Sequence, residues 1–208
     1  MLRTATRSEV LPLFEREHRY AGLSSSCTYL FAVEEEGRIV AAYAWQPPPF
    51  GCARSVCPEQ PSGVLALSRM VAVPREERQL RHISKPLRVQ MRRMIDRTRW
   101  PVLVTFSDEG LGHTGHVYKC SGWEKTTRAL RPQYVDEKGR RTSTYANGRH
   151  SREGLTLIGN AYIQRWEHWV CERGSALQHM IERGWRRVQV PGRVWKSGSQ
   201  AYKWERAA

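Results

Sequence analysis

The segment from Val102 to Trp123 constrains the fold of this chain more than any other. It begins with a short apolar run, Val102–Phe106, that is typical of a buried strand. The run breaks into a polar, glycine-rich turn that holds Asp108 and His113. A short helix then ends near Gly122, since glycine readily takes the left-handed conformation that closes a helix. Few folds place a strand, a loop with an acid and an imidazole, and a short tyrosine-bearing helix in so little chain.

The remaining patterns predict an α/β fold with a mixed central sheet flanked by helices. We expect, in order, a helix over 4–20 capped by Ser8, strands over 28–33, 38–45 and 64–73, a helix capped by Ser84, the strand 102–106, a short helix, and strands over 124–135, 185–190 and 200–204. We interpret 46–63 as a loop without regular structure and 160–171 as helical. At 208 residues the chain fits one domain, with a core over 4–135 and a basic C-terminal part over 136–208 that completes the sheet.

The charge of the chain is its second informative property. Thirty-four Lys and Arg against 20 Asp and Glu give a net charge of +14, which attracts polyanions. The eight Trp and eight Tyr offer surfaces on which unpaired bases can stack. We therefore predict a nucleic acid as a partner; a basic enzyme whose only anionic partner is its cofactor remains the alternative. The expected DNA contacts are Arg88, Arg92, Arg93, Arg186, Arg187 and Lys196.

Several classes of protein are disfavoured by composition. No window approaches the length of apolar chain that spans a membrane, and the N-terminus lacks a signal-peptide pattern, so we expect a cytoplasmic protein. The five cysteines are an odd number without a CxxC pair, which favours free thiols over disulfides or a zinc site. We interpret Cys120 as a packing residue, because no base is evidently paired with it.

The loop between Val73 and Ser84 has the properties of an anion site. It follows a strand, is rich in basic residues and leads into a helix whose first amides lack intrahelical partners. It contains no glycine, so it is neither a P-loop nor a dinucleotide fingerprint. A pyrophosphate would be bound by Arg78, Arg81, His82, Ile83 and Ser84; the alternative is a solvated basic loop.

Arg69 interrupts an otherwise apolar strand. A charge at that position must face a cavity or a carboxylate, because burying it alone is costly. It could hold Asp108 at the end of the neighbouring strand or an anionic group of a substrate. An outward-facing arginine on a half-exposed sheet is the other interpretation.

Asp108 follows a strand, at the edge of the sheet where open α/β folds gather their active sites. With His113 and a distant His18 it could form an acid–base pair or a metal site. We favour participation of Asp108 in the site but not metal binding; capping of the following turn is the alternative. Tyr118 has a phenol that can protonate a departing thiolate.

The order of these elements resembles the Gcn5-related N-acetyltransferase fold. It runs from a strand through a basic loop, a helix and a second strand to Tyr118-Lys-Cys-Ser-Gly122-Trp123. The resemblance implies that the loop before the helix binds the pyrophosphate of acetyl-coenzyme A and that Tyr118 protonates the leaving thiolate. The loop Arg78–Ser84 departs from the family pattern because it has no glycine.

A narrower resemblance covers roughly residues 14–123. The chain is similar to the phage Mom DNA-modification proteins through Leu67-Ser-Arg-Met-Val71, Ile83-Ser84, Ser107-Asp108, Gly112-His-Thr-Gly115 and Tyr118…Trp123. This implies conversion of adenine in DNA to an N6-methylcarbamoyl, acyl-type form that protects phage DNA from restriction, and it implies double-stranded DNA as the partner. It also implies roles for Arg69, Ser84, Asp108, Tyr118 and, as a further candidate, His18. An iron-dependent step would involve His18, Asp108 and His113.

Two other functions stay open at this point. An acetyltransferase of this fold could act on a small amine, on a protein or on an aminomethylated pyrimidine in hypermodified phage DNA. A basic DNA-binding protein without activity could use the same scaffold. Residues 136–200 could form a DNA clamp, the arm of a homodimer or part of the sheet.

Overall fold

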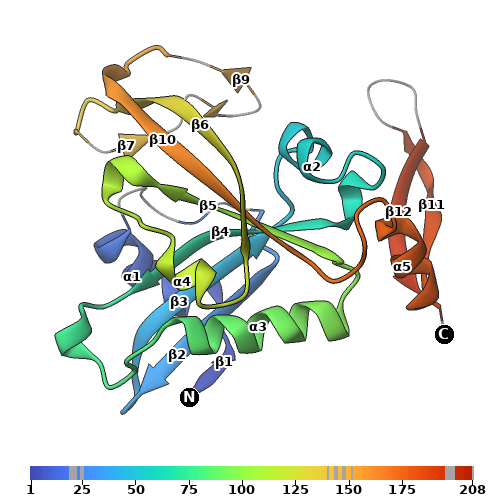
Figure 1. Cartoon of the computed structure of the whole chain (residues 1–208), viewed down its shortest axis with the longest axis horizontal. Helices are drawn as coiled ribbons and strands as arrows, with labels where there is room; N and C mark the ends of the chain where they lie inside the picture. The colour runs from blue at the N-terminus through green and yellow to red at the C-terminus, as the bar shows by residue number, and fades with distance from the viewer. Residues whose placement is uncertain are drawn as a thin grey trace.

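A computed structural model shows a mixed α/β fold and describes residues 1–18, 23, 26–139, 141–142, 145–146, 149–150, 152–194 and 200–207 (Figure 1). Within these residues the main sheet has eight strands, in the order β1-β2-β3-β4-β5-β10-β6-β7. Its strands are β1 (Leu2–Thr4), β2 (Tyr29–Glu35), β3 (Arg38–Gln46), β4 (Val64–Ala72), β5 (Val102–Asp108), β6 (Glu124–Val135), β7 (Arg141–Thr142) and β10 (Thr156–Trp169). The helices are α1 (Arg7–Glu17), α2 (Phe50–Val56), α3 (Ser84–Arg97), α4 (His116–Lys119) and α5 (Ala176–Glu182). Two small sheets are formed by β8 (Tyr145–Ala146) with β9 (Arg149–His150), and by β11 (Trp185–Val194) with β12 (Gln200–Arg206).

The predicted α/β fold with a mixed sheet flanked by helices is confirmed, whereas two segments were wrongly predicted. Part of the expected loop over 46–63 forms α2, because Ala53 and Val56 give it a buried apolar side. The segment 160–171, expected as a helix, belongs to the long strand β10. This strand lies between β5 and β6 and is antiparallel to both.

Both predicted helix caps are displaced. The first helix is capped by Thr6 and not by Ser8, since Thr6 Oγ1 and the Thr6 N–H both donate to the Glu9 carboxylate at 2.7 and 2.6 Å. In α3 the cap position is Ile83, and Ser84 is already the first helical residue.

The centre of the core is β3, where every residue from Val40 to Trp45 is buried. Trp45 Nε1 donates to Gln90 Oε1 of α3 at 3.0 Å, and the Tyr43 hydroxyl donates to the Ile83 carbonyl at 2.9 Å. These two side chains, one strand period apart, hold α3 on one face of the sheet. Since β3 is buried on both faces, α1, which contacts β3 and β4, covers the other face.

The incomplete pairing of β4 with β5 creates an opening in the sheet. The parallel strands β4 and β5 pair only from Val64 to Ala66 on β4, and α3 makes the crossover between them. Beyond this point the strands separate, although β4 continues to Ala72 and β5 to Asp108. At the fork, Thr105 Oγ1 of β5 donates to the Leu67 carbonyl of β4 at 3.0 Å. Side chains from both strands face the opening between them.

The C-terminal part contains elements that lie to one side of the main sheet. α5 and the hairpin β11–β12 follow β10, beside α2 (Figure 1). The strands expected over 185–190 and 200–204 are confirmed, and α5 was not predicted. None of the helices described here has the length and apolar character needed to cross a membrane.

Candidate active site

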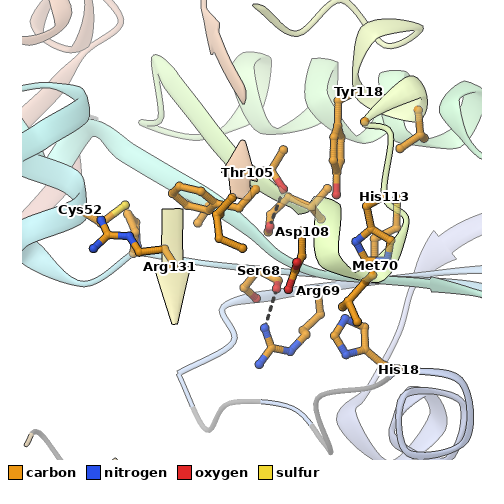
Figure 2. Close-up of a pocket in the computed structure, with 18 of the residues that line it drawn as sticks. His18, Cys52, Ser68, Arg69, Met70, Thr105, Asp108, His113, Tyr118 and Arg131 are labelled. Carbon is orange, nitrogen blue, oxygen red and sulfur yellow. Dashed lines mark hydrogen bonds between the residues drawn. The ribbon is translucent and has the colours of Figure 1, made fainter. Parts of the chain in front are cut away.

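A cavity of about 1060 Å³ occupies the opening between β4 and β5. Its wall is built by β4, by β5 with the loop that follows it, by α4 and by β6. The lining includes five residues from the sequence-based site prediction: His18, Arg69, Asp108, His113 and Tyr118. Figure 2 shows Asp108 at the centre of this group. Segments far apart in the sequence therefore converge on one hollow.

Asp108 is the last residue of β5 and is buried. Its Oδ1 accepts a hydrogen bond from the Gly110 N–H at 2.9 Å, so it caps the turn Glu109–Leu111. Its Oδ2 lies 3.7 Å from Nη1 of Arg141, whose side chain comes from β7. Asp108 therefore both caps this turn and lines the cavity, whereas the sequence presented capping and participation in the site as alternatives. The carboxylate is held at a fixed position on the cavity wall.

Tyr118 lies on α4 and is buried, with its hydroxyl end directed into the cavity (Figure 2). Its ring packs against Trp123 and Trp166, with ring centroids 6.0 and 5.9 Å away. Burial raises the pKa of Tyr118, and a hydrogen bond with Thr105 acts in the opposite direction. A buried phenol with a raised pKa stays protonated at neutral pH and can serve as a proton donor.

Arg69 lines the cavity. This agrees with the interpretation that its charge faces a cavity or a carboxylate. Its Nη1 donates to the Ser68 carbonyl at 3.0 Å, shown as a dashed line in Figure 2. The cavity also contains Arg131 of β6, which the sequence analysis did not select. These arginines give part of the lining a positive charge.

The sequence left open a metal site of His18, Asp108 and His113 without favouring it. In the described residues, no group of three or more His, Cys, Asp or Glu side chains could hold a metal ion. His18, Asp108 and His113 all line the cavity, but they come from the end of α1, from β5 and from the loop before α4. In Figure 2 the Met70 side chain is drawn between the two imidazoles. The residues present do not fit an iron centre.

The loop expected to bind pyrophosphate lies outside the lining of this cavity. The carboxylate of Glu35, on the β2–β3 hairpin, accepts hydrogen bonds from the N–H groups of Gln79 and Leu80 at 2.7 and 2.6 Å. Arg78 Nε donates to the Val73 carbonyl at 3.1 Å. Two amides and one arginine that could bind phosphate are thus used within the protein. Arg81 and His82 are exposed and remain available for an anion.

Ser84 is separated from the other predicted site residues. It is buried at the start of α3, and its carbonyl accepts a hydrogen bond from Ser121 Oγ at 3.3 Å. It is not among the described residues that line the cavity. Next to it, the Lys85 N–H donates to the His82 carbonyl, and Pro86 has no N–H. Few amides of this helix start are therefore open to an anion.

The predicted DNA contacts fall on two surfaces. Arg88, Arg92 and the partly exposed Arg93 lie on α3, and Arg186 and Arg187 lie exposed on β11. Lys196 lies outside the described residues. The thiol of Cys120, interpreted from the sequence as packing, is exposed and 3.3 Å from His116 Nε2, so that interpretation is corrected.

Sequence reasoning missed Arg141, because it lies in a polar segment with no pattern that predicts a contact with Asp108. It also missed Gln133, whose Oε1 accepts from Arg141 Nη1 at 3.0 Å. Alternation along β6 could have indicated that Arg131 and Gln133 share one face of the strand.

The comparisons with known proteins agree with this geometry. A family model described as the Mom protein family matches residues 2–172. A ribosomal-protein-alanine N-acetyltransferase from Brucella melitensis has a similar structure, with a TM-score of 0.52, 14% identity, and coverage of 82% of this chain and 99% of that one. A polyamine N-acetyltransferase from Drosophila melanogaster gives a TM-score of 0.52, 10% identity and the same coverage. At these identities the likeness concerns the fold. No curated protein sequence matches the chain.

Proposed function

The chain belongs to the Mom protein family and has the N-acetyltransferase fold, and from this premise we propose that it transfers an acyl-type group from a coenzyme A thioester to the N6 amino group of adenine in DNA. One observation carries the proposal: the Asp108 carboxylate and the Tyr118 hydroxyl face the same cavity, between two separated strands. A proton donor and a proton acceptor that line the same cavity suit a reaction in which one group loses a proton and another gains one.

The fork between β4 and β5 suits an extended thioester chain. β5 pairs with β4 only as far as Ala66, so the edge of Ser68–Met70 on the β5 side faces the cavity, while β3 pairs with the other edge. An extended chain with amide groups can add to such a strand edge through backbone hydrogen bonds. The exposed Arg81 and His82 would attract the phosphates at the other end of the donor.

In the reaction, the amino nitrogen attacks the thioester carbonyl carbon, a C–N bond forms and the C–S bond breaks. Asp108 accepts the proton that the nitrogen loses. Tyr118 donates its hydroxyl proton to the departing sulfur, and the proton on Asp108 returns to the phenolate through solvent. The cations Arg69 and Arg131 favour the negative charge that develops on the carbonyl oxygen.

DNA as the substrate is supported by charge. The protein carries a net charge of +14, and phosphate neutralisation by basic residues supplies most of the affinity for DNA. An adenine amino group can react only after the base leaves the stack, which requires a deep pocket. A cavity of about 1060 Å³ is large enough for a base beside a thioester.

A small polyamine is a weaker candidate. The described lining includes Arg69, Arg131 and three histidines but only one carboxylate, Asp108. A polycation would be repelled by the arginines, whereas a nucleotide would be attracted.

The test is nucleoside mass analysis of plasmid DNA from cells that express the chain or its Tyr118→Phe variant. A heavier deoxyadenosine that is present with the wild type and lost in the variant supports the proposal, and its mass identifies the added group. If DNA remains unmodified while a small amine or a protein is acylated by the purified chain, the DNA substrate is wrong. If Asp108→Ala and Tyr118→Phe leave every function intact, the protein is not an enzyme.

A further inference from the structure

A second hollow, of about 1330 Å³, lies between α2, the turn Pro61–Gly63, α5 and the β11–β12 hairpin. We call it the hairpin groove. The residues that line it are Phe50, Gln60, Pro61, Ser62, Arg99, Leu177, Ile181, Trp185, Arg186, Arg187, Gln200, Tyr202, Lys203 and Trp204. The family match ends at residue 172, so α5 and the hairpin lie beyond the matched part of the chain.

The described lining of the hairpin groove carries basic residues and no carboxylate. Lys203 is paired with Glu205 at 2.6 Å, whereas Arg99 and Arg187 have no carboxylate within 4.0 Å among the described residues. Burial lowers the pKa of Arg99 to about 10. An anion bound in the groove would supply the missing counter-charge and so lower the free-energy cost of leaving these cations unneutralised.

An aromatic ring of the groove holds one of its arginines, Arg187, in place. Arg187 and Trp204 are opposite each other in the hairpin, and Tyr202 lies two residues from Trp204, so all three share one face. The guanidinium of Arg187 lies 3.9 Å from the centre of the Tyr202 ring. Trp204 Nε1 donates to Ser62 Oγ at 3.0 Å, which fixes the hairpin against the rest of the protein.

The Arg187 guanidinium occupies one face of the Tyr202 ring, and the Trp204 indole N–H is held by Ser62. Single-stranded nucleic acid is bound mainly by stacking on open aromatic faces. Contacts to a duplex are made mostly to phosphates by arginines and lysines. The four basic side chains of the groove lining, Arg99, Arg186, Arg187 and Lys203, therefore suit the sugar–phosphate backbone of a duplex.

The hairpin groove adjoins the candidate active site. α2 forms a common wall, because Pro49 and Cys52 line the cavity while Phe50 lines the groove. Phe50 is 70% exposed at the start of this helix, between the two hollows. DNA held in the groove would lie beside α2, which also lines the cavity.

We infer that the hairpin groove binds the backbone of duplex DNA and presents it to the cavity across α2. The inference rests on the proposed function, since it gives that function its DNA-binding surface. It differs from a general attraction of DNA to a basic protein, because it places the contacts on Arg186 and Arg187 and on the elements around them.

The experiment measures binding of a short fluorescent duplex over a series of salt concentrations. Arg186→Ala/Arg187→Ala is compared with Arg16→Ala/Arg38→Ala, which removes the same charge from exposed positions on α1 and β3, away from the hairpin. Each phosphate contact contributes about 0.9 to the slope of log affinity against log salt. We expect the groove variant to lose up to about 1.8 in slope and at least about tenfold in affinity at 0.1 M salt, with the control unchanged. Thermal unfolding followed by circular dichroism checks that both variants fold.

Three results would overturn the inference. Equal losses in the two double variants would indicate only the overall charge. No loss in the groove variant, with DNA modification intact, would place the DNA elsewhere and leave the proposed function standing. Tighter binding of a single strand or RNA than of the duplex would make another nucleic acid the occupant. Absence of DNA modification by the wild type, with the groove variant still deficient in duplex binding, would instead contradict the proposed function alone.

Discussion

Nη1 of Arg141 lies 3.7 Å from Oδ2 of Asp108, and this ion pair joins the end of β5 to the start of β7. The same guanidinium donates to Gln133 Oε1 at 3.0 Å and to the Gly110 carbonyl at 3.4 Å. The other carboxylate oxygen of Asp108 accepts from the Gly110 N–H. The proposed base is thus positioned by a residue more than thirty positions away in the chain.

We expect Asp108→Asn to abolish most of the DNA modification. An amide cannot accept the proton of the attacking nitrogen, and loss of a general base commonly costs about 10²–10⁴ in rate. The Asn side chain can still accept the Gly110 hydrogen bond, so thermal stability should change little. The measurement is the initial rate of modified deoxyadenosine formation; a variant that retains wild-type activity would exclude Asp108 as the base.

Arg141 acts as a positioning residue. Arg141→Ala should lower the rate less than Asp108→Asn does, because the carboxylate remains but is held only by the turn. Arg141→Lys keeps the charge and should recover part of the activity. A purely structural role predicts instead that both substitutions reduce stability and that Lys gives no rescue of rate at a temperature where both variants are folded.

Tyr118→Phe removes the hydroxyl without changing the ring that packs against Trp123 and Trp166. We expect a fall of about 10²–10⁴ in the rate and little change in stability. The proposed role requires the phenol in its protonated form, and burial raises its pKa above the usual value of about 10. Activity should therefore not decline through loss of this proton below about pH 10. A decline near neutral pH that disappears in the variant would contradict this assignment.

The segment from the end of β4 to α4 was predictable because its signals are local. An apolar run defines β5, a charged residue within a strand marks Arg69, and a tyrosine before Gly122 marks α4. These patterns identified Asp108 and Tyr118 as residues of one site, and both line the cavity.

The errors arose where long-range contacts determine the structure. The segment 160–171 was predicted as a helix but belongs to the strand β10, in which the charged residue Glu167 is fully buried. Its carboxylate is satisfied by Arg165 at 2.8 Å, by Arg173 at 3.1 Å and by Trp169 Nε1 at 2.8 Å. Sequence spacing cannot indicate such a cluster, nor the hydrogen bonds between Glu35 and the loop before α3.

Glu35→Gln tests the role of that carboxylate. Two backbone N–H groups, of Gln79 and Leu80, donate to its two oxygens, and the NH₂ group of Gln cannot accept one of them. We expect a loss of about 1–3 kcal/mol in the free energy of unfolding, measured by urea denaturation. Glu36→Gln is the matched control, because Glu36 accepts only from the Gln79 side chain among its hydrogen bonds described here. Equal effects of the two substitutions would show that the amide contacts are unimportant.

Gly115→Ala should disrupt the support of Tyr118. Gly115 has a φ of 70°, and a Cβ there would lie 2.1 Å from Cζ2 of Trp166. Trp166 is buried and cannot give way easily, because its Nε1 donates to Ser107 Oγ at 2.9 Å. Gly112→Ala is the control: its φ is 72°, but its Cβ would meet no atom within 4 Å. We expect about 1–2 kcal/mol of backbone strain in the control and at least about 1–3 kcal/mol more in Gly115→Ala from overpacking. Chemical denaturation gives both values, and equal losses would mean that the contact between α4 and Trp166 is not tight.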